Sequence, residues 1–282
     1  MLLMAAASLL VAPKTFARTA SRIATLDWAL LETLLASGAD VIAAPELVQY
    51  RQVAVSPAAG SKIADLGLRG SPNLERLPGL KPDLIFNSNF YAWADPLLAR
   101  IAPVESLSVY VPGTDPWEMA EKAALAIGER LSLPGAARMV ETVDRQVARL
   151  GPLLKTRGIA PVLPVNLGDA RHLRVFGGDS MFGQTLRRLG IENAWAGATS
   201  YSAMAPVGIE TLSAMPDAFI LFIGPHSQTA YDAMRASDFW NALPQARNGR
   251  FLDIVSINPY GGLPSAQRFL SLLARGLGID EG

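Results

Sequence analysis

The sequence predicts an α/β protein of two lobes, each built on a mainly parallel sheet, joined by one long helix. Short apolar strand segments alternate with helical segments in both halves of the chain, a pattern typical of parallel sheets covered by helices on both faces. A single long amphipathic segment separates the two halves. The 282 residues suffice for two lobes of about 100–150 residues each. We therefore place the first lobe at 21–133, the linker helix at 134–157 and the second lobe at 158–282.

The first half opens with a strand over Arg22–Leu26 and a helix over Ala29–Ser37. Gly38 follows that helix, and a glycine in this place is typical of a helix end. The remaining predicted elements are strands at Val41–Ala43, Leu84–Phe86 and Val104–Val109 and a helix at Trp117–Leu131.

Before the Leu84–Phe86 strand lies a loop and a short helix. Asn73 is predicted to cap this helix, because its side chain can accept from free first-turn amides. Pro78 and Gly79 keep the helix brief. The strand itself is wholly apolar, as expected where both faces are covered. Arg69 precedes the helix among small residues; its guanidinium can point into a cleft or simply lie in solvent.

The long middle segment shows one continuous apolar face. Spacings of four and three alternate, which marks one side of a helix, at Ala136, Val140, Val143, Val147, Leu150 and Leu154. Pro134 and Gly135 stand at its start and Gly158 just past its end. An ordinary surface helix fits the same pattern, but the βα alternation that resumes afterwards favours a linker between lobes.

The second half again alternates strands with helices. The predicted strands are Pro161–Val165, Ala218–Ile223 and Phe251–Ile254, and the helices are Phe182–Leu189, Thr229–Ala236 and Ala266–Leu277. A cleft between two such lobes is a preferred place for a ligand.

Composition excludes several classes of function. The 25 basic and 25 acidic side chains balance, so nothing indicates a nucleic-acid partner. The absence of cysteine from the sequence excludes disulfides, thiolate metal sites and thiol catalysis. The two histidines, His172 and His226, lack an obvious cluster of carboxylates, which disfavours a metal site built by the protein. No feature indicates oligomerisation, and a monomer is expected.

The N-terminus is predicted to be an export signal over residues 1–20. Met1–Val11 is almost wholly apolar, and Thr15–Ala17 offers a small-residue cleavage site. The basic segment that usually precedes such a run is missing, which indicates a start upstream of Met1; an apolar terminus on a cytosolic protein is the alternative. Beyond Ala17, no apolar stretch reaches the roughly 18 residues of a membrane span.

Several passages carry a resemblance to a known family. A glycine-flanked Arg69 followed by PNLE (Pro72–Glu75) and LKPDLI (Leu80–Ile85) is similar to the periplasmic binding proteins of iron-siderophore and cobalamin importers. Three further passages narrow the resemblance to the ferric-hydroxamate (ferrichrome-type) members: RIATLDWALLETLLASGAD (Arg22–Asp40), HLRVFGGDSMFGQTLRRLGIENAW (His172–Trp195) and DFWNALPQARNGRF (Asp238–Phe251). The resemblance implies the class III fold, two Rossmann-like lobes joined by one long helix.

The same resemblance implies a ligand site in the cleft. It puts Arg69 and Tyr91 on the metal-bound hydroxamate oxygens, which a guanidinium and a phenol suit as donors. Tyr91 also follows a strand at the edge where open α/β sheets bind ligands. Trp28 matches the N-lobe wall. On the C-lobe side the expected contacts are Tyr201, Met204, Asn258 and Tyr260. Ser202 and Asn258 each occupy a position at which the hydroxamate binders carry a tryptophan. This difference predicts a roomier or more polar C-lobe wall.

Two glutamates are expected on the outer surface of the lobes. Glu75 and Glu210 each fall near a helix start, where a carboxylate stabilises the helix dipole. Their matching placement resembles the two lobe-tip glutamates with which this family docks onto the membrane permease.

The predicted function is therefore that of a soluble, periplasmic receptor of an ABC importer, not an enzyme, that carries an Fe(III)-hydroxamate siderophore. The iron is held by the siderophore, with no protein-bound metal or cofactor. The same fold with cobalamin, haem or a catecholate siderophore as cargo is the nearest alternative. An α/β hydrolase using Ser180 with His172 or His226 is the second, although Ser180 lacks a nucleophile-elbow context and is expected, with Asp179, to cap a helix.

Overall fold

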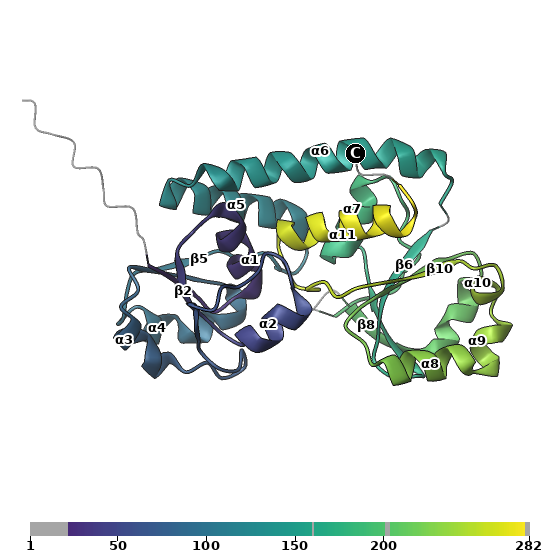
Figure 1. Cartoon of the computed structure of the whole chain (residues 1–282), viewed down its shortest axis with the longest axis horizontal. Helices are drawn as coiled ribbons and strands as arrows, with labels where there is room; N and C mark the ends of the chain where they lie inside the picture. Colours follow the sequence, from purple (N-terminus) through teal and green to yellow (C-terminus); the bar gives the residue numbers. More distant parts are fainter. Residues whose placement is uncertain (1–21, 160, 201–203, 280–282) are drawn as a thin grey trace, which may run out of the picture.

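The computed structural model describes residues 22–159, 161–200 and 204–279. The predicted export signal and the predicted site residues Tyr201 and Ser202 lie outside these ranges. Within them the chain folds as two lobes, each around its own sheet, with the long helix α6 (Pro134–Thr156) running across both (Figure 1).

The sheet of the first lobe has five strands in the order β3-β2-β1-β4-β5, all parallel. Its strands are β1 (Ile23–Thr25), β2 (Val41–Ala44), β3 (Ala64–Asp65), β4 (Leu84–Asn87) and β5 (Val104–Ser106). The connecting helices are α1 (Trp28–Ser37), α2 (Leu47–Val53), η1 (Leu74–Arg76), α3 (Leu77–Leu80), η2 (Asn89–Ala94), α4 (Asp95–Leu98) and α5 (Pro116–Leu131). The predicted parallel sheet is confirmed, while α2 and β3 were not predicted.

Local capping explains where α1 begins and ends. Asp27 Oδ1 accepts from the backbone amides of Ala29 and Leu30 at 2.7 and 3.2 Å, which satisfies two free donors of the first turn. Gly38 ends the helix in the left-handed region at φ 86°, where only glycine is unstrained. The predicted cap at Asn73 is wrong, because its side chain makes no capping bond to the short η1.

The sheet of the second lobe is mixed, in the order β10-β9-β6-β7-β8. The strands β6 (Val162–Leu167), β9 (Phe219–Ile223) and β10 (Phe251–Ile254) pair in parallel, whereas β7 (His172–Phe176) and the edge strand β8 (Met204–Gly208) pair antiparallel. Neither β7 nor β8 was predicted. A short turn joins β6 to β7, and such a hairpin can only be antiparallel. The helices of this lobe are α7 (Met181–Arg188), η3 (Ile209–Ala214), α8 (Gln228–Ala236), α9 (Asp238–Ala242), α10 (Pro244–Arg247) and α11 (Leu263–Gly276).

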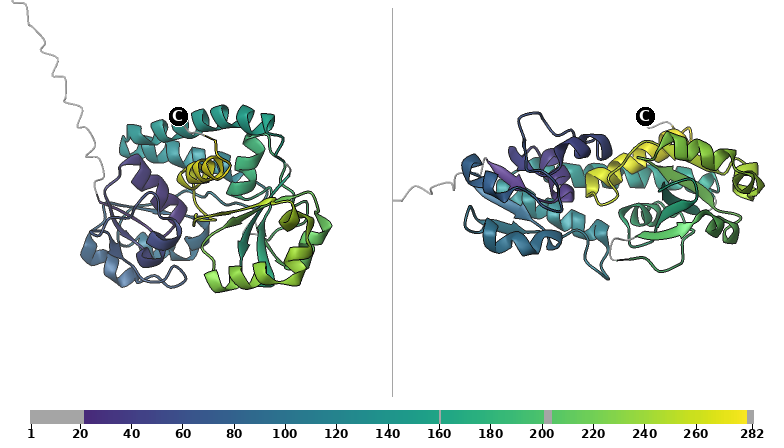
Figure 2. Two further views of the ribbon diagram at one scale, coloured as in Figure 1. Left: turned by 45° about the vertical axis from the view of Figure 1, so that its right-hand side comes forward. Right: turned by 90° about the horizontal axis from the view of Figure 1, so that it is seen from below.

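The predicted linker helix is confirmed as α6, whose inward residues Ala136, Val143 and Leu150 are fully buried. The C-terminal helix α11 lies beneath α6 between the two lobes (Figures 1 and 2). Buried residues of both lobes, α6 and α11 form one continuous apolar cluster, from Ile23 and Trp28 to Phe182 and Phe269 among others. The lobes are therefore joined by a shared core as well as by the chain.

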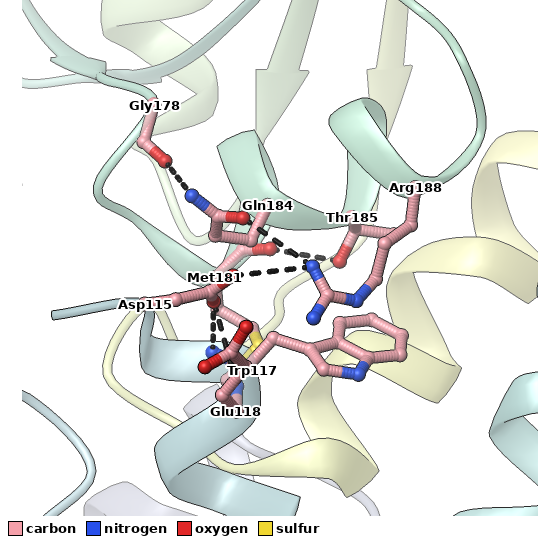
Figure 3. Close-up of polar contacts among 8 residues, drawn as sticks. All are labelled: Asp115, Trp117, Glu118, Gly178, Met181, Gln184, Thr185 and Arg188. Carbon is pink, nitrogen blue, oxygen red and sulfur yellow. Dashed lines mark hydrogen bonds and ion pairs between the residues drawn. The ribbon is translucent and has the colours of Figure 1, made fainter.

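A second connection between the lobes is polar (Figure 3). Asp115 caps α5 through Oδ1, and its Oδ2 accepts from Nη1 of Arg188 on α7 at 3.3 Å. The Arg188 guanidinium also lies 4.7 Å from the ring centroid of Trp117. Gln184 accepts from the same guanidinium and donates to the Gly178 carbonyl at 2.7 Å. This half-buried network ties the first turn of α5 to α7, and such contacts oppose a large relative rotation of the lobes.

Candidate functional site

Two adjoining hollows lie between the lobes and share Trp28, Arg69 and Tyr260 as wall residues. The N-lobe hollow, about 450 Å³, is lined by Asp27, Trp28, Glu46, Arg69, Gly70, Phe90, Tyr91 and Tyr260. The C-lobe hollow, about 250 Å³, adds residues such as Gln49, Asn166, Arg174, Phe176, Phe182, Met204 and Asn258. Together they offer the space of a small-molecule site with apolar walls and a few polar groups.

Arg69 lies at the boundary of the two hollows and is held in place from two sides. Its Nε donates to Glu46 Oε2 at 2.6 Å, and its guanidinium carbon lies 3.7 Å from the ring centroid of Trp28. Trp28 is itself fixed, since its Nε1 donates to the Pro45 carbonyl at 3.0 Å. An arginine stacked on a buried indole and paired through Nε keeps its terminal nitrogens available as donors. One third of the side chain is exposed, so a ligand can reach it.

Tyr91 lines the N-lobe hollow together with Arg69, from η2, the turn that follows β4. Its backbone is fixed by two bonds: its amide donates to Ser88, and its carbonyl accepts from Asn87 Nδ2 at 2.9 Å. Burial, with a smaller effect of Asp27, raises the pKa of Tyr91 to about 12. The phenol therefore keeps its proton at neutral pH and can donate it to an anionic oxygen. The sequence predicted a hollow shared by Arg69 and Tyr91, and the structure brings them together.

Asp27 adds a buried carboxyl to the same hollow. Its Oδ2 accepts from Ser88 Oγ at 2.6 Å while Oδ1 caps α1. Burial raises the pKa of Asp27, and these hydrogen bonds together with the nearby Arg69 lower it in part. Asp27 thereby ties the turn that follows β4 to the first helix and sets the position of Tyr91 relative to Arg69.

On the C-lobe side, Met204 and Tyr260 line the hollow as predicted, and the Tyr260 hydroxyl donates to Met204 Sδ at 3.3 Å. Tyr110 packs edge-on against Tyr260, with centroids 5.9 Å apart, and its hydroxyl donates to the Gly261 carbonyl at 2.9 Å. These contacts join the aromatic wall to the loop after β10. Tyr201 and Ser202 lie outside the described residues.

Asn258 lines the C-lobe hollow but is engaged on both ends of its amide. Its Nδ2 donates to Glu32 Oε1 at 2.7 Å, and its Oδ1 accepts from the Tyr260 amide at 3.1 Å. The residue thus orients Tyr260, and the polar wall expected at this position is largely internal to the protein. Direct contact of Asn258 with a ligand remains a prediction.

Glu32 is the polar centre of the contact between α1 and the loop before α11. Its Oε2 accepts from the Gly262 amide at 3.1 Å and from Ser265 Oγ at 2.8 Å, and its Oε1 accepts from Asn258. Glu32 is fully buried, and burial raises its pKa to about 8 although the three donors lower it. A β-carbon on Gly261 would lie 2.4 Å from Oε2, so the loop backbone approaches the carboxyl closely. This cluster was not predicted.

Several charged residues on the cleft were also missed, among them Asp27, Glu46 and Arg174. Asp27 and Glu46 directly follow β1 and β2, at the same sheet edge that led to the selection of Tyr91. If the residues that follow every predicted strand are considered in the same way as Tyr91, both Asp27 and Glu46 are found. Arg174 could be found only from the alternation of β7, which was not recognised as a strand.

The remaining predicted residues lie away from the cleft. Glu75 and Glu210 are both exposed and each falls in the first turn of a short helix, η1 or η3. Ser180 is buried and caps α7, accepting from the Gly183 amide at 2.9 Å and donating to the Gly177 carbonyl at 2.7 Å. His172 instead pairs with Asp169 and His226 with Asp253. This geometry does not support the hydrolase alternative.

Two searches of the described residues bear on metals and membranes. Residues 22–159, 161–200 and 204–279 contain no group of three or more His, Asp or Glu side chains placed to hold a metal ion. In these same ranges no helix has the length and apolar character needed to cross a bilayer.

Comparison with known proteins gives consistent matches. The family model described as periplasmic binding protein matches residues 23–257. The iron(3+)-hydroxamate-binding protein FhuD of Escherichia coli (strain K12) is 33% identical over 259 residues, 92% of this chain and 87% of that protein. The achromobactin-binding periplasmic protein of Dickeya dadantii is 26% identical over 78% of this chain and 74% of its own.

Among solved structures, the Fe3+-Desferal-bound siderophore binding protein FhuD from Vibrio cholerae superposes with a TM-score of 0.85. The two sequences are 23% identical, and the match covers 97% of that chain and 91% of this one. The petrobactin-binding protein YclQ from Bacillus subtilis matches with a TM-score of 0.76 at 22% identity, over 93% of each chain. Both likenesses confirm the predicted fold of two α/β lobes and a linking helix.

Proposed function

Because the chain belongs to the periplasmic binding protein family, we propose that it is the substrate-binding component of an ABC importer and carries an Fe(III)-hydroxamate siderophore. The observation that carries this proposal is the meeting of Arg69 and Tyr91 in one hollow between the lobes. The E. coli relative that is 33% identical is named for binding iron(3+)-hydroxamate, and it supports the same ligand class.

The chemistry of the hollow suits a ferric hydroxamate. Each oxygen that chelates Fe(III) carries partial negative charge, and donors that do not compete for the metal hold it best. The terminal nitrogens of Arg69 and the protonated phenol of Tyr91 are such donors. The aromatic residues Trp28, Phe90 and Tyr260 then contact the organic part of the siderophore. The iron is cargo, bound by the siderophore, and the protein supplies the outer coordination sphere.

We further propose that the protein works in the periplasm as a monomer and delivers its ligand to an inner-membrane permease. The exposed Glu75 and Glu210, one on each lobe, are the proposed docking points. Two separate anionic contacts determine orientation more than affinity.

The binding test is a tryptophan-fluorescence titration with ferrichrome and with ferrioxamine. Trp28 forms a wall of both hollows, so a bound ferric complex is expected to quench it at micromolar ligand. Arg69→Ala is expected to weaken binding by about ten- to a hundred-fold, the value of a charge-assisted hydrogen bond. Tyr91→Phe is expected to have a smaller effect, as is Tyr201→Ala.

Arg100→Ala is the matched control, since Arg100 is exposed and lies on neither hollow. An absence of quenching by several hydroxamates would contradict the proposal. The colour and mass of a ligand that copurifies from iron-starved cells would then distinguish a catecholate, haem or cobalamin cargo.

A further inference from the structure

The C-lobe hollow contains a second guanidinium, and we propose that it selects the ligand. Arg174 on β7 and Arg69 line the same hollow from opposite lobes. We infer that Arg174 binds a free carboxylate of the siderophore, so that the receptor prefers ferric hydroxamates carrying carboxylate groups over neutral ones. This inference rests on the proposed function, because it assumes that a ferric hydroxamate occupies the cleft.

The strand geometry determines where Arg174 points. Side chains alternate between the two faces of a strand: Leu173 and Val175 are buried in the core of the second lobe, while Arg174 and Phe176 face the hollow. Arg174 is exposed, so a ligand in the hollow can reach its side chain.

A neutral neighbour orients the guanidinium. Arg174 lies directly opposite Asn166 in the β6–β7 ladder, and its Nη1 donates to Asn166 Oδ1 at 3.2 Å. Asn166 is anchored in turn, because its Nδ2 donates to the Ile223 and Pro225 carbonyls at 2.8 and 3.0 Å. The amide therefore positions Arg174 without neutralising its charge.

The two arginines of the hollow differ in how their charge is balanced. Arg69 forms an ion pair with Glu46 at 2.6 Å. For Arg174, no carboxylate of the described residues lies within 4.0 Å of its nitrogens, and the described wall of the C-lobe hollow includes neither Asp nor Glu. The C-lobe hollow thus carries an uncompensated positive charge.

A planar guanidinium with free donors matches a carboxylate in geometry and charge. A neutral trihydroxamate complex offers no such partner, whereas a citrate-bridged dihydroxamate with further carboxyl groups on its arms keeps carboxylates outside the iron chelate and a net negative charge. Arg174 and Arg69 line the C-lobe hollow, and Arg69 and Tyr91 line the adjoining N-lobe hollow, so we expect a chelate that spans both hollows to contact all three.

The test compares two probes on one set of variants. The probes are ferrichrome, a neutral trihydroxamate complex, and ferric aerobactin, a citrate-bridged dihydroxamate complex with two carboxylates outside the iron chelate. Arg174→Gln is expected to weaken binding of ferric aerobactin by about ten- to a hundred-fold, as for loss of a charge-assisted hydrogen bond, and to change ferrichrome binding by less than about twofold. Arg174→Lys is expected to recover part of the loss, since it retains the charge but not the planar fork.

Arg171→Gln is the matched control, because Arg171 is exposed on the same hairpin and lines neither hollow. Raising the salt concentration is expected to weaken the binding of ferric aerobactin to the wild type more than that of ferrichrome. Equal losses for both probes in Arg174→Gln, or no loss for either, would overturn the inference while leaving the proposed function intact. Failure of the wild type to bind both probes would overturn the proposed function and the inference with it.

Discussion

The hydrogen bonds of the buried Glu32 carboxyl are expected to help hold the two lobes together. Removal of this carboxyl is the most direct test of that expectation. In Glu32→Ala, three donors lose their acceptor: Asn258 Nδ2, the Gly262 amide and Ser265 Oγ. Two donors belong to the loop between β10 and α11 and the third, Ser265, to the first turn of α11. They lie 226 to 233 residues along the chain from Glu32, so the contacts form only when the tertiary structure does.

The magnitude follows from the number of bonds. A buried hydrogen bond contributes about 1 kcal/mol net, so loss of all three is expected to lower the free energy of unfolding by about 3 kcal/mol. For a chain of this size that corresponds to a decrease in Tm of roughly 6–12 °C. In Glu32→Gln, the amide nitrogen replaces one of the two carboxylate oxygens and cannot accept a hydrogen bond. A smaller decrease in the free energy of unfolding, about 1 kcal/mol, is therefore expected.

The assay is thermal and urea unfolding followed by circular dichroism, with ligand binding measured in parallel. Ser265→Ala removes a single donor and is the matched control, with an expected loss of about 1 kcal/mol. Since Asn258 also holds Tyr260 through its amide, Glu32→Ala is expected to weaken ligand binding as well. A Tm for Glu32→Ala within about 2 °C of that of Ser265→Ala, a difference worth no more than about 1 kcal/mol in a chain of this size, would refute the view that the three bonds act together.

Two further predictions concern pH and delivery. The pKa of Glu32 is raised from 4.5 to about 8 in the folded protein, so the native state binds the Glu32 proton more tightly than the unfolded state does. Protonation of Glu32 therefore stabilises the folded protein. This contribution to the free energy of unfolding is fully present below about pH 4.5 and is lost as the pH rises towards 8. Urea unfolding of the wild type at several pH values in this interval is expected to show that decline, with a shallower slope in Glu32→Gln, and an equal slope in both proteins would argue against it. For delivery, Glu75→Lys combined with Glu210→Lys is expected to abolish siderophore-dependent iron uptake by cells while leaving binding in solution unchanged. Glu129→Lys combined with Glu141→Lys, at two other exposed positions, is the charge-matched control, and normal uptake by the Glu75/Glu210 double variant would exclude these residues as docking points.

Elements with a strong local signal were predicted closely. The long apolar face from Ala136 to Leu154 became α6, and the uniformly apolar Leu84–Phe86 became a central strand. Phe251–Ile254 was predicted with its observed bounds. Errors occurred where a local signal was weak, as in the two-residue β3, or ambiguous, as at Asn73, whose side chain does not cap the helix that follows.

The antiparallel strands of the second sheet show a different source of error. In β7, His172–Val175 alternates exposed and buried residues, the pattern of a strand with one open face. Four alternating residues are a weak signal, and no strand was predicted over this segment. The antiparallel pairing of β7 and β8 and the position of Arg174 on the cleft were therefore not predicted.

The amino-acid sequence by itself determined the alternation of strands and helices, the linker helix, and the selection of Arg69 and Tyr91 as candidate donors. These depend on periodicity, capping and turn chemistry within a few residues, together with a resemblance that runs along the chain. Only the tertiary structure decided which groups share a wall: Glu46 against Arg69, Glu32 against Asn258, and Arg174 across from the N-lobe. Such pairings join residues far apart in the sequence, and their free energy depends on burial and on distances of a few ångströms, which local pattern does not contain.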